Sequence, residues 1–228
     1  MKNTDNGLLL FKTNYSESSL IMTFYTELNG LSRYIYKGGK KKKTPFLVFG
    51  HYEINSFKRP ESDLGIINSL TIATPHLSTT SHPIKVLISY FIGDVLKQTL
   101  REEQSDQQLF SFLLSLAEEL NKTDNLKVFP LEFLANLIVL LGVAPKTVEN
   151  ATEFNLEEGY FLSNDKGNRT TKEESIASYL NELFINLKGP QRQVEKDTLT
   201  TLLSYMRIHV PLFDNSKSIS IIREVLYD

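Results

Sequence analysis

The sequence contains no cysteine among its 228 residues. This absence excludes disulfide bonds, thiolate nucleophiles and every thiolate-ligated zinc or iron–sulfur site. Long apolar runs are also absent: the longest, residues 133–143, contains Asn136 and falls well short of the roughly 20 residues that cross a bilayer. The first residues lack the extended apolar region and cleavage site of a signal peptide. We therefore expect a soluble protein of the cytoplasm.

The chain as a whole also lacks an excess of either charge, because 25 Lys and Arg face 27 Asp and Glu, giving a net charge of −2. This balance hides an asymmetry. Residues 1–60 carry ten basic and four acidic side chains (net +6), whereas residues 61–228 carry fifteen basic and twenty-three acidic ones (net −8). Positive charge gathered on one segment is typical of a surface that meets an anionic partner.

The first 75 residues predict an antiparallel sheet. Five runs are rich in β-branched and aromatic residues and are separated by polar or proline-containing turns: 7–14, 19–27, 31–37, 45–57 and 64–74. Asn29-Gly30, between the second and third runs, is a strong signal for a β-hairpin. An open sheet of five such strands would expose two edges. We therefore expect a five-stranded antiparallel barrel that is similar to the OB-fold.

After Pro75 the apolar residues follow helical spacing. We expect helices at 83–101, 106–121, 130–141, 171–187, 195–209 and 217–227. Residues 144–170 lose this periodicity and are expected to form loops. The predicted fold is therefore α+β. It has an OB-fold-like domain over residues 1–76 and an α-helical bundle over residues 77–228, with a loop-rich insertion at about 144–171.

Catalytic and metal-binding patterns are scarce. The segment from Gly38 to Thr44 superficially resembles a phosphate-binding loop, but it lacks the required upstream glycine and is followed by Pro45 rather than a helix. The four histidines are scattered, and no Gly-x-Ser-x-Gly or Gly-x-Gly-x-x-Gly motif is present. Acidic pairs such as Glu102-Glu103 lie on helices expected to face solvent. We therefore predict a protein that is not an enzyme and binds no cofactor or metal.

The feature that indicates a function is a lysine-rich tip after the third predicted strand. It is formed by Lys37, Lys40, Lys41, Lys42 and Lys43. The two-residue period of a strand puts Arg33 on the same face as Lys37, and Tyr34 and Tyr36 on the other. Basic residues interleaved with aromatic ones suit sequence-tolerant binding of single strands, because cations neutralise phosphates and aromatic rings stack on bases. A lysine run in a solvated loop explains the same pattern. The alternative function is therefore a protein-interaction adaptor without a nucleic-acid site.

Two stretches, 12–30 (KTNYSESSLIMTFYTELNG) and 36–41 (YKGGKK), resemble the opening of the bacterial DNA repair and recombination mediator family RecO. Later helices of that family are similar to 87–96, 109–113, 133–145 and 217–226. The resemblance implies a non-enzymatic protein that binds single- and double-stranded DNA, anneals complementary strands, and helps load RecA recombinase onto gaps coated by single-strand-binding protein (SSB). Many members bind structural zinc with four cysteines in the region matching 144–171. This chain has none, so we expect no zinc.

The resemblance also implies partners and contact residues. The expected partners are DNA, RecR and the acidic C-terminal tail of SSB, at the cytoplasmic nucleoid and away from membranes. The basic strand and tip become the DNA contacts: Lys12, Tyr15, Arg33, Lys37, Lys40, Lys41, Lys42 and Lys43. An acidic tail that ends in a hydrophobic residue calls for an apolar pocket rimmed by cations. The candidate cations are Lys97 with Arg101, and Arg207 with Lys217, although ordinary solvated helix faces explain these residues as well.

Overall fold

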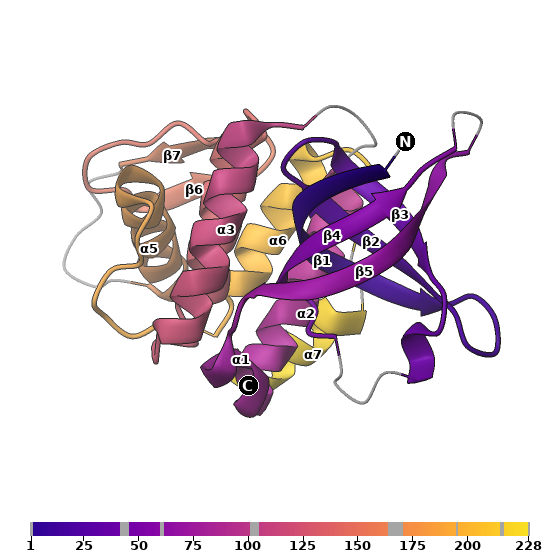
Figure 1. The fold of residues 1–228 in the computed structure, drawn as a ribbon. Coiled ribbons are helices and arrows are strands. Elements are labelled where there is room, and N and C mark those ends of the chain that lie inside the picture. Colours follow the sequence, from indigo (N-terminus) through magenta and orange to yellow (C-terminus); the bar gives the residue numbers. More distant parts are fainter. Residues whose placement is uncertain are drawn as a thin grey trace. The chain divides into compact units, whose positions relative to one another are not determined.

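The structure is a computed structural model that describes residues 2–41, 46–59, 62–100, 105–163, 171–194, 196–214 and 217–227. Its N-terminal strands are β1 (Lys2–Asn14), β2 (Leu20–Thr26), β3 (Gly30–Tyr36), β4 (His51–Phe57) and β5 (Leu64–Thr74). A turn of 3-10 helix, η1 (Gly39–Lys41), follows β3. The strands close into a barrel in the order β1-β2-β3-β5-β4 (Figure 1). The predicted five-stranded barrel is confirmed.

The barrel contains one pairing that the strand patterns did not indicate. β1 pairs with β2 and β4, β2 with β3, and β4 with β5, all antiparallel. β3 and β5 are parallel, with Arg33 opposite Leu64 and Ile35 opposite Ile66. This arises because the chain passes through β4 before β5 returns beside β3. The sheet is therefore mixed, and the antiparallel prediction holds for four of its five pairings.

Alternating side chains fill the interior of the barrel. Met22 and Phe24 on β2 and Ile54 on β4 are fully buried, and they belong to one hydrophobic cluster drawn from all five strands. The ring of Phe24 packs edge-on against Tyr34 and Tyr52, with ring centroids 6.0 and 6.1 Å away. Edge-to-face packing of this kind is favoured by the aromatic quadrupole. Most of the apolar and aromatic residues of the strands are thus buried in the core.

The directions of the strands determine at which end of the barrel each connection lies. Since β1, β2 and β3 alternate in direction and β5 runs parallel to β3, the β1–β2 and β3–β4 connections share one end. We call this the loop end. The β2–β3 turn and the β4–β5 connection share the opposite end, which we call the mouth end. The two ends are about 20 Å apart, because β2, β3 and β4 have seven residues each and a strand rises roughly 3.3 Å per residue.

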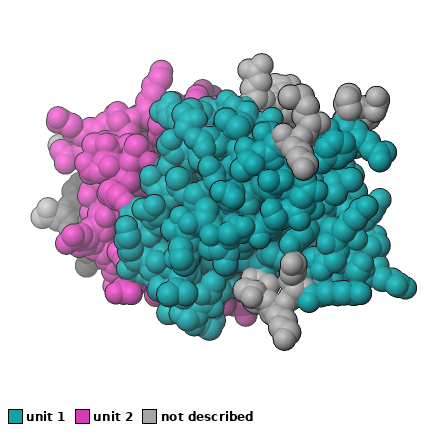
Figure 2. Space-filling model, viewed as in Figure 1, with its two compact units in different colours: residues 1–123 teal, residues 124–228 magenta. Residues whose placement is uncertain are grey.

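The described residues form two compact units, residues 1–123 and 124–228 (Figure 2). The first unit adds three helices to the barrel, α1 (Leu77–Ser81), α2 (Pro83–Thr99) and α3 (Gln107–Lys122). α2 lies so close to β1 that a Cβ on Gly93 would be 2.3 Å from the carbonyl oxygen of Leu10. The N–H of Asp106, which caps α3, donates a hydrogen bond to the Tyr25 hydroxyl at 3.1 Å. The predicted domain division after residue 76 stays a prediction.

The second unit contains a two-stranded hairpin and four helices: α4 (Phe129–Leu140), β6 (Glu153–Asn155), β7 (Tyr160–Leu162), α5 (Lys172–Asn186), α6 (Thr198–His209) and α7 (Lys217–Tyr227). The helical C-terminal region is therefore confirmed. Thr171 and Glu174 form a capping box at the start of α5, as their spacing predicts. Of the predicted insertion, residues 144–163 carry the hairpin, and 164–170 lie outside the described residues.

Candidate nucleic-acid interface

Two connections are joined by hydrogen bonds at the loop end of the barrel. The backbone N–H of Lys40 in η1 donates to the carbonyl of Ser18 at 3.2 Å, and its Nζ donates to the carbonyl of Ser16 at 2.5 Å. Ser16 and Ser18 belong to the β1–β2 loop, which also carries Tyr15. Gly38, with a φ of 72°, makes the left-handed turn that leads from β3 into η1. These contacts bring the lysine tip and Tyr15 to one surface.

The residues gathered at the loop end are exposed. Lys37, Lys40 and Lys41 are exposed, and Tyr15 has 57% of its surface accessible to solvent. Lys42 and Lys43, the other predicted members of the tip, lie outside the described residues. An exposed aromatic ring beside several cations supplies the two features that a sequence-tolerant strand binder needs, a stacking surface and a positive field.

Lys12, a predicted DNA contact on β1, is partly used within the protein. Its ammonium donates a hydrogen bond to the carbonyl of Phe46 at 2.7 Å and lies 5.9 Å from the centre of the Phe46 ring. The side chain is half-buried, and this burial lowers the pKa of Lys12 below its usual value. Lys12 therefore fastens the segment before β4 to β1, and it offers an incoming phosphate less than the exposed lysines do.

Strand β3 separates its basic and aromatic residues as the two-residue period predicts. Arg33 is exposed, whereas Tyr34 and Tyr36 are each only 6% exposed and belong to the core cluster. Tyr25 on β2 is also buried and is occupied by its contact with α3. Of Tyr15, Tyr25, Tyr34 and Tyr36, only Tyr15 is exposed. Arg33 lies between the two ends of the barrel and so extends the basic surface along β3.

Two cationic residues at the mouth end do not stand out in the sequence. Lys58 and Arg59, exposed residues directly after β4, lie in one of the polar, proline-containing turns between the predicted strands. Lys58 and Arg33 both line a cavity of about 360 Å³ at this end of the barrel. The signal that could have identified them is the barrel prediction itself, because OB-folds bind ligands with the β4–β5 connection as well as with the β1–β2 loop.

The predicted partner-binding residues fall in both units. Lys97 on α2 is exposed, and its Nζ lies 4.7 Å from the centre of the Phe11 ring, a cation–π distance. Arg101 lies outside the described residues. Arg207 on α6 forms an ion pair with Asp214 at 3.7 Å, and Lys217 begins α7. Both pairs stay predictions.

Within the described part of the chain, no three His, Cys, Asp or Glu side chains are grouped in a way that could bind a metal ion. The described helices also include none that is long and apolar enough to cross a membrane. Among the described residues, the loop end presents the ammonium groups of its lysines, serine hydroxyls, the carboxylate of Glu17 and the ring of Tyr15.

The barrel defines a class of protein. Five strands closed in the order β1-β2-β3-β5-β4, with cations beside the connections at both ends, are the architecture of the OB-fold, which binds oligonucleotides and oligosaccharides. A family model described as "Recombination protein O N terminal" matches residues 1–76, and one described as "Recombination protein O C terminal" matches residues 81–183. The chain belongs to the RecO family of DNA repair proteins, which are non-enzymatic recombination mediators.

Individual relatives are similar over nearly their whole length. The "DNA repair protein RecO" of Christiangramia forsetii is 29% identical over 231 residues, which cover 96% of this chain and 97% of the relative. The proteins of the same name from Phocaeicola vulgatus and Bacteroides fragilis are 25% and 24% identical, with the same coverage of both chains. The resemblance seen in the sequence and the prediction that the protein is not an enzyme are both confirmed.

Proposed function

We propose that this protein binds single- and double-stranded DNA through the loop end of its barrel, anneals complementary strands, and helps load RecA recombinase onto gaps coated by SSB. The observation that carries the proposal is the hydrogen-bonded contact between η1 and the β1–β2 loop, which gathers Tyr15, Lys37, Lys40 and Lys41 on one exposed surface. We assign the DNA contacts to the domain predicted over residues 1–76.

The mechanism is electrostatic. Two DNA strands repel each other through their phosphates, and lysines that contact both backbones reduce this repulsion, so that complementary strands approach and pair. Contacts to phosphates carry no sequence information, which suits a protein that must act at any gap. Tyr15 adds a stacking surface for an unpaired base. The protein makes and breaks no covalent bond in these steps.

The remaining partners are RecR and the C-terminal tail of SSB, at the nucleoid. Membership of the RecO family supports DNA and the other proteins of the RecFOR pathway as partners. For the acidic tail of SSB we propose the surface around Lys97 and Arg101 on the first unit, or that around Arg207 and Lys217 on the second. Replacing either pair by Ala tests these sites, because only the true site should weaken binding of a labelled tail peptide.

Salt-dependent DNA binding tests the main proposal. Fluorescence anisotropy of a labelled single strand is measured from 50 to 300 mM NaCl for the wild type and for Lys37→Ala/Lys40→Ala/Lys41→Ala. Loss of three phosphate contacts should weaken binding and reduce the slope of log K against log salt by about 2, since each contact to single strands contributes roughly 0.7. The annealing rate of complementary oligonucleotides should fall in parallel.

The matched control removes three exposed lysines from elsewhere in the chain, Lys122, Lys127 and Lys146. It should leave the affinity and the slope unchanged. Tyr15→Ala should weaken single-strand binding roughly tenfold through lost stacking, whereas Lys12→Gln should change it less than Lys41→Ala. Equal slopes for the two triple variants would refute the loop end as the DNA site, and an absence of DNA binding by the wild type would favour the adaptor function.

A further inference from the structure

The mouth end of the barrel opens into a polar cavity of about 360 Å³. This volume is at the lower end of the range of roughly 300–1,000 Å³ for ligand pockets, and the mouths of β-barrels are among their usual positions. The residues used in the argument below come from β1, β3, β4 and the β2–β3 and β4–β5 connections: Asn3, Asn29, Ser32, Arg33, Ser56 and Lys58. A cavity of this size admits one small polar ligand.

The polar groups of the cavity are held in place by buried neighbours. The carboxylate of Asp5, only 4% exposed, accepts hydrogen bonds from the Asn29 side-chain amide at 2.8 Å and from the Leu28 N–H at 3.2 Å. Tyr34 also lines the cavity. Burial raises the pKa of Tyr34, while hydrogen bonds with Ser32 and Ser56 oppose this rise. The tyrosine therefore stays neutral at physiological pH. Amide and hydroxyl groups are thus positioned before any ligand arrives.

The ring of Tyr34 forms the wall of the cavity on the side of β5. A Cβ on Gly65 would be 2.5 Å from the Tyr34 ring, so glycine is required where β5 passes the ring. Parallel pairing between β3 and β5 begins only at Arg33. The first residues of β3, including Ser32, are therefore bordered on that side by the cavity rather than by β5.

Strand β3 connects this cavity to the loop end. Arg33 lines the cavity, and Lys37 lies four residues further along the chain on the same side of the strand. Four residues of extended chain span about 13 Å. A DNA strand bound to the tip and running along β3 therefore reaches the mouth, where Lys58 and Arg59 add positive charge beside the single carboxylate of the cavity lining, that of Asp63. OB-folds bind oligonucleotides along such a path, between the β1–β2 and β4–β5 connections.

We propose that the mouth cavity binds one unstacked nucleotide of a DNA single strand, an inference that rests on the proposed function. Arg33 and Lys58 face its phosphate, to which a guanidinium donates paired hydrogen bonds. The amide of Asn29 and the hydroxyls of Ser32 and Ser56 face its base, because such groups both donate to and accept from base edges. A base in a duplex must first be unpaired and unstacked. The cavity therefore favours single strands over duplex DNA.

A variant that fills the cavity without changing any charge tests this proposal. Ser32→Phe places a ring in the mouth and leaves all the lysines and arginines in position. The expected result is a roughly tenfold loss of affinity for a labelled single strand, with duplex affinity unchanged within about twofold, both measured by fluorescence anisotropy at one salt concentration. Asn3→Phe, at an exposed residue of the cavity lining, is the second variant should Ser32→Phe fold poorly.

Direct binding gives an independent measurement. Deoxycytidine monophosphate should shift the amide resonances of Asn29 and Gly65 in the wild type, and should not shift them in Ser32→Phe. Inorganic phosphate and deoxycytidine, tested separately, should each bind more weakly than the nucleotide. If the filled variant loses single-strand and duplex affinity equally, or if the nucleotide leaves these resonances unmoved, the cavity is not a nucleotide site.

Variants of the loop end and of the cavity distinguish the DNA site of the proposed function from the nucleotide cavity. Lys37→Ala/Lys40→Ala/Lys41→Ala should weaken single-strand and duplex binding to the same extent and leave the deoxycytidine monophosphate shifts in place. If the lysine variant behaves so and the filled variant binds like the wild type, then the loop end binds DNA and only the nucleotide cavity is refuted. If the wild type binds neither kind of DNA, the proposed function itself is refuted.

Discussion

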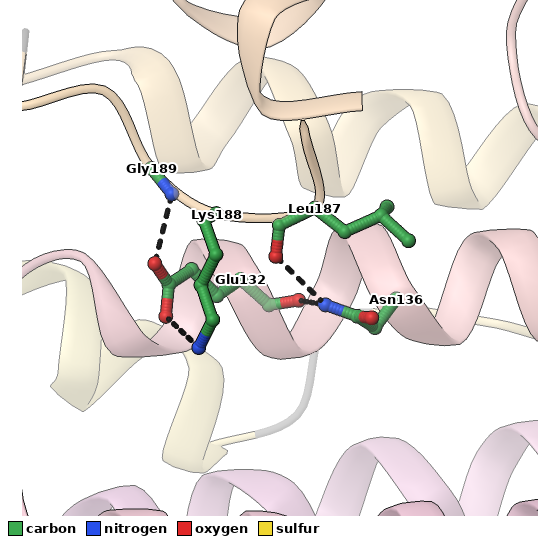
Figure 3. Close-up of polar contacts among 5 residues, drawn as sticks. All are labelled: Glu132, Asn136, Leu187, Lys188 and Gly189. Carbon is green, nitrogen blue, oxygen red and sulfur yellow. Dashed lines mark hydrogen bonds and ion pairs between the residues drawn. The ribbon is translucent and has the colours of Figure 1, made fainter. Parts of the chain in front are cut away.

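The carboxylate of Glu132 accepts a hydrogen bond of 2.8 Å from the backbone N–H of Gly189 (Figure 3). Glu132 also contacts the ammonium of Lys188 at 3.5 Å. One turn further along α4, the side-chain amide of Asn136 donates to the carbonyl of Leu187 at 3.2 Å. The last turn of a helix leaves backbone groups without partners inside the helix. Asn136 thus supplies a partner for the carbonyl at the end of α5, and Glu132 binds the segment that follows, so two side chains of α4 join it to α5.

Replacing Glu132 by Ala should therefore destabilise the second unit. The Gly189 N–H would lose its partner in a half-buried position, a change that costs about 1–3 kcal/mol. The matched control is Lys188→Ala, because that ammonium is largely exposed and surface ion pairs contribute less than about 1 kcal/mol. Urea unfolding followed by circular dichroism measures both. Equal losses in the two variants would show that the backbone hydrogen bond contributes little.

Gly93 allows α2 to lie against β1. A methyl group there would meet the Leu10 carbonyl oxygen at 2.3 Å and the Val48 side chain at 3.1 Å. Gly→Ala within a helix usually stabilises by roughly 0.5–1 kcal/mol, whereas here overpacking should destabilise the first unit by about 1–3 kcal/mol. A stability increase for Gly93→Ala in thermal unfolding would contradict this contact. The sign of the change is therefore the test.

Patterns in the sequence predict those features of the fold that depend on residues close together in the chain. Alternation along β3 puts Arg33 outside and Tyr34 inside, and the helical spacing that begins at residue 171 predicts α5, because both patterns act over a few residues. Contacts between distant segments could not be read from these patterns. They include the parallel pairing of β3 with β5, the bond from Lys12 to Phe46, and the cavity in which Arg33 meets the β4–β5 connection. Exposure along β3 could therefore be predicted from the sequence, whereas the cations at the mouth end could not; the DNA contacts themselves stay a prediction.

The half-buried His51 and the buried His76 should make the first unit less stable in acid. Burial lowers the pKa of both His51 and His76, and the proximity of His51 lowers that of His76 further. Glu118 opposes the shift at both imidazoles, and Glu27 opposes it at His51. The Nε2 atoms of both rings are buried and have no hydrogen-bond partner among the described residues. Protonation of either ring in the folded state is therefore unfavourable.

The direction of the pH effect follows from these lowered values. An unfolded chain binds protons at histidine below a pH of about 6.5. The folded imidazoles, whose pKa is lower, bind fewer protons there, so the free energy of unfolding falls as pH decreases from 7 to 5. His51→Gln/His76→Gln should reduce this slope. Urea midpoints at pH 7.5 and 5.5 measure it. The same slope in the variant and the wild type would assign the acid sensitivity to other groups.

Aromatic rings hold the β6–β7 hairpin against α6. Phe154 stacks on Phe161 with centroids 4.1 Å apart and planes 13° from parallel, and it lies 5.3 Å from the ring of Tyr205. His209 continues the cluster 4.2 Å from Tyr205, and its Nε2 hydrogen bonds with the carbonyl of Leu156 at 2.7 Å. In a chain without cysteine, these contacts join the hairpin to α6.

Two measurements separate aromatic packing from metal binding. Phe161 is only 1% exposed, so Phe161→Ala should lower the free energy of unfolding by about 3–5 kcal/mol, whereas Phe161→Leu, which leaves a smaller cavity, should cost less. We expect packing rather than a metal to stabilise the hairpin, so excess EDTA should leave the thermal midpoint of the wild type unchanged. A midpoint that falls with EDTA and is restored by added Zn²⁺ would show instead that a bound metal contributes to the stability of the second unit.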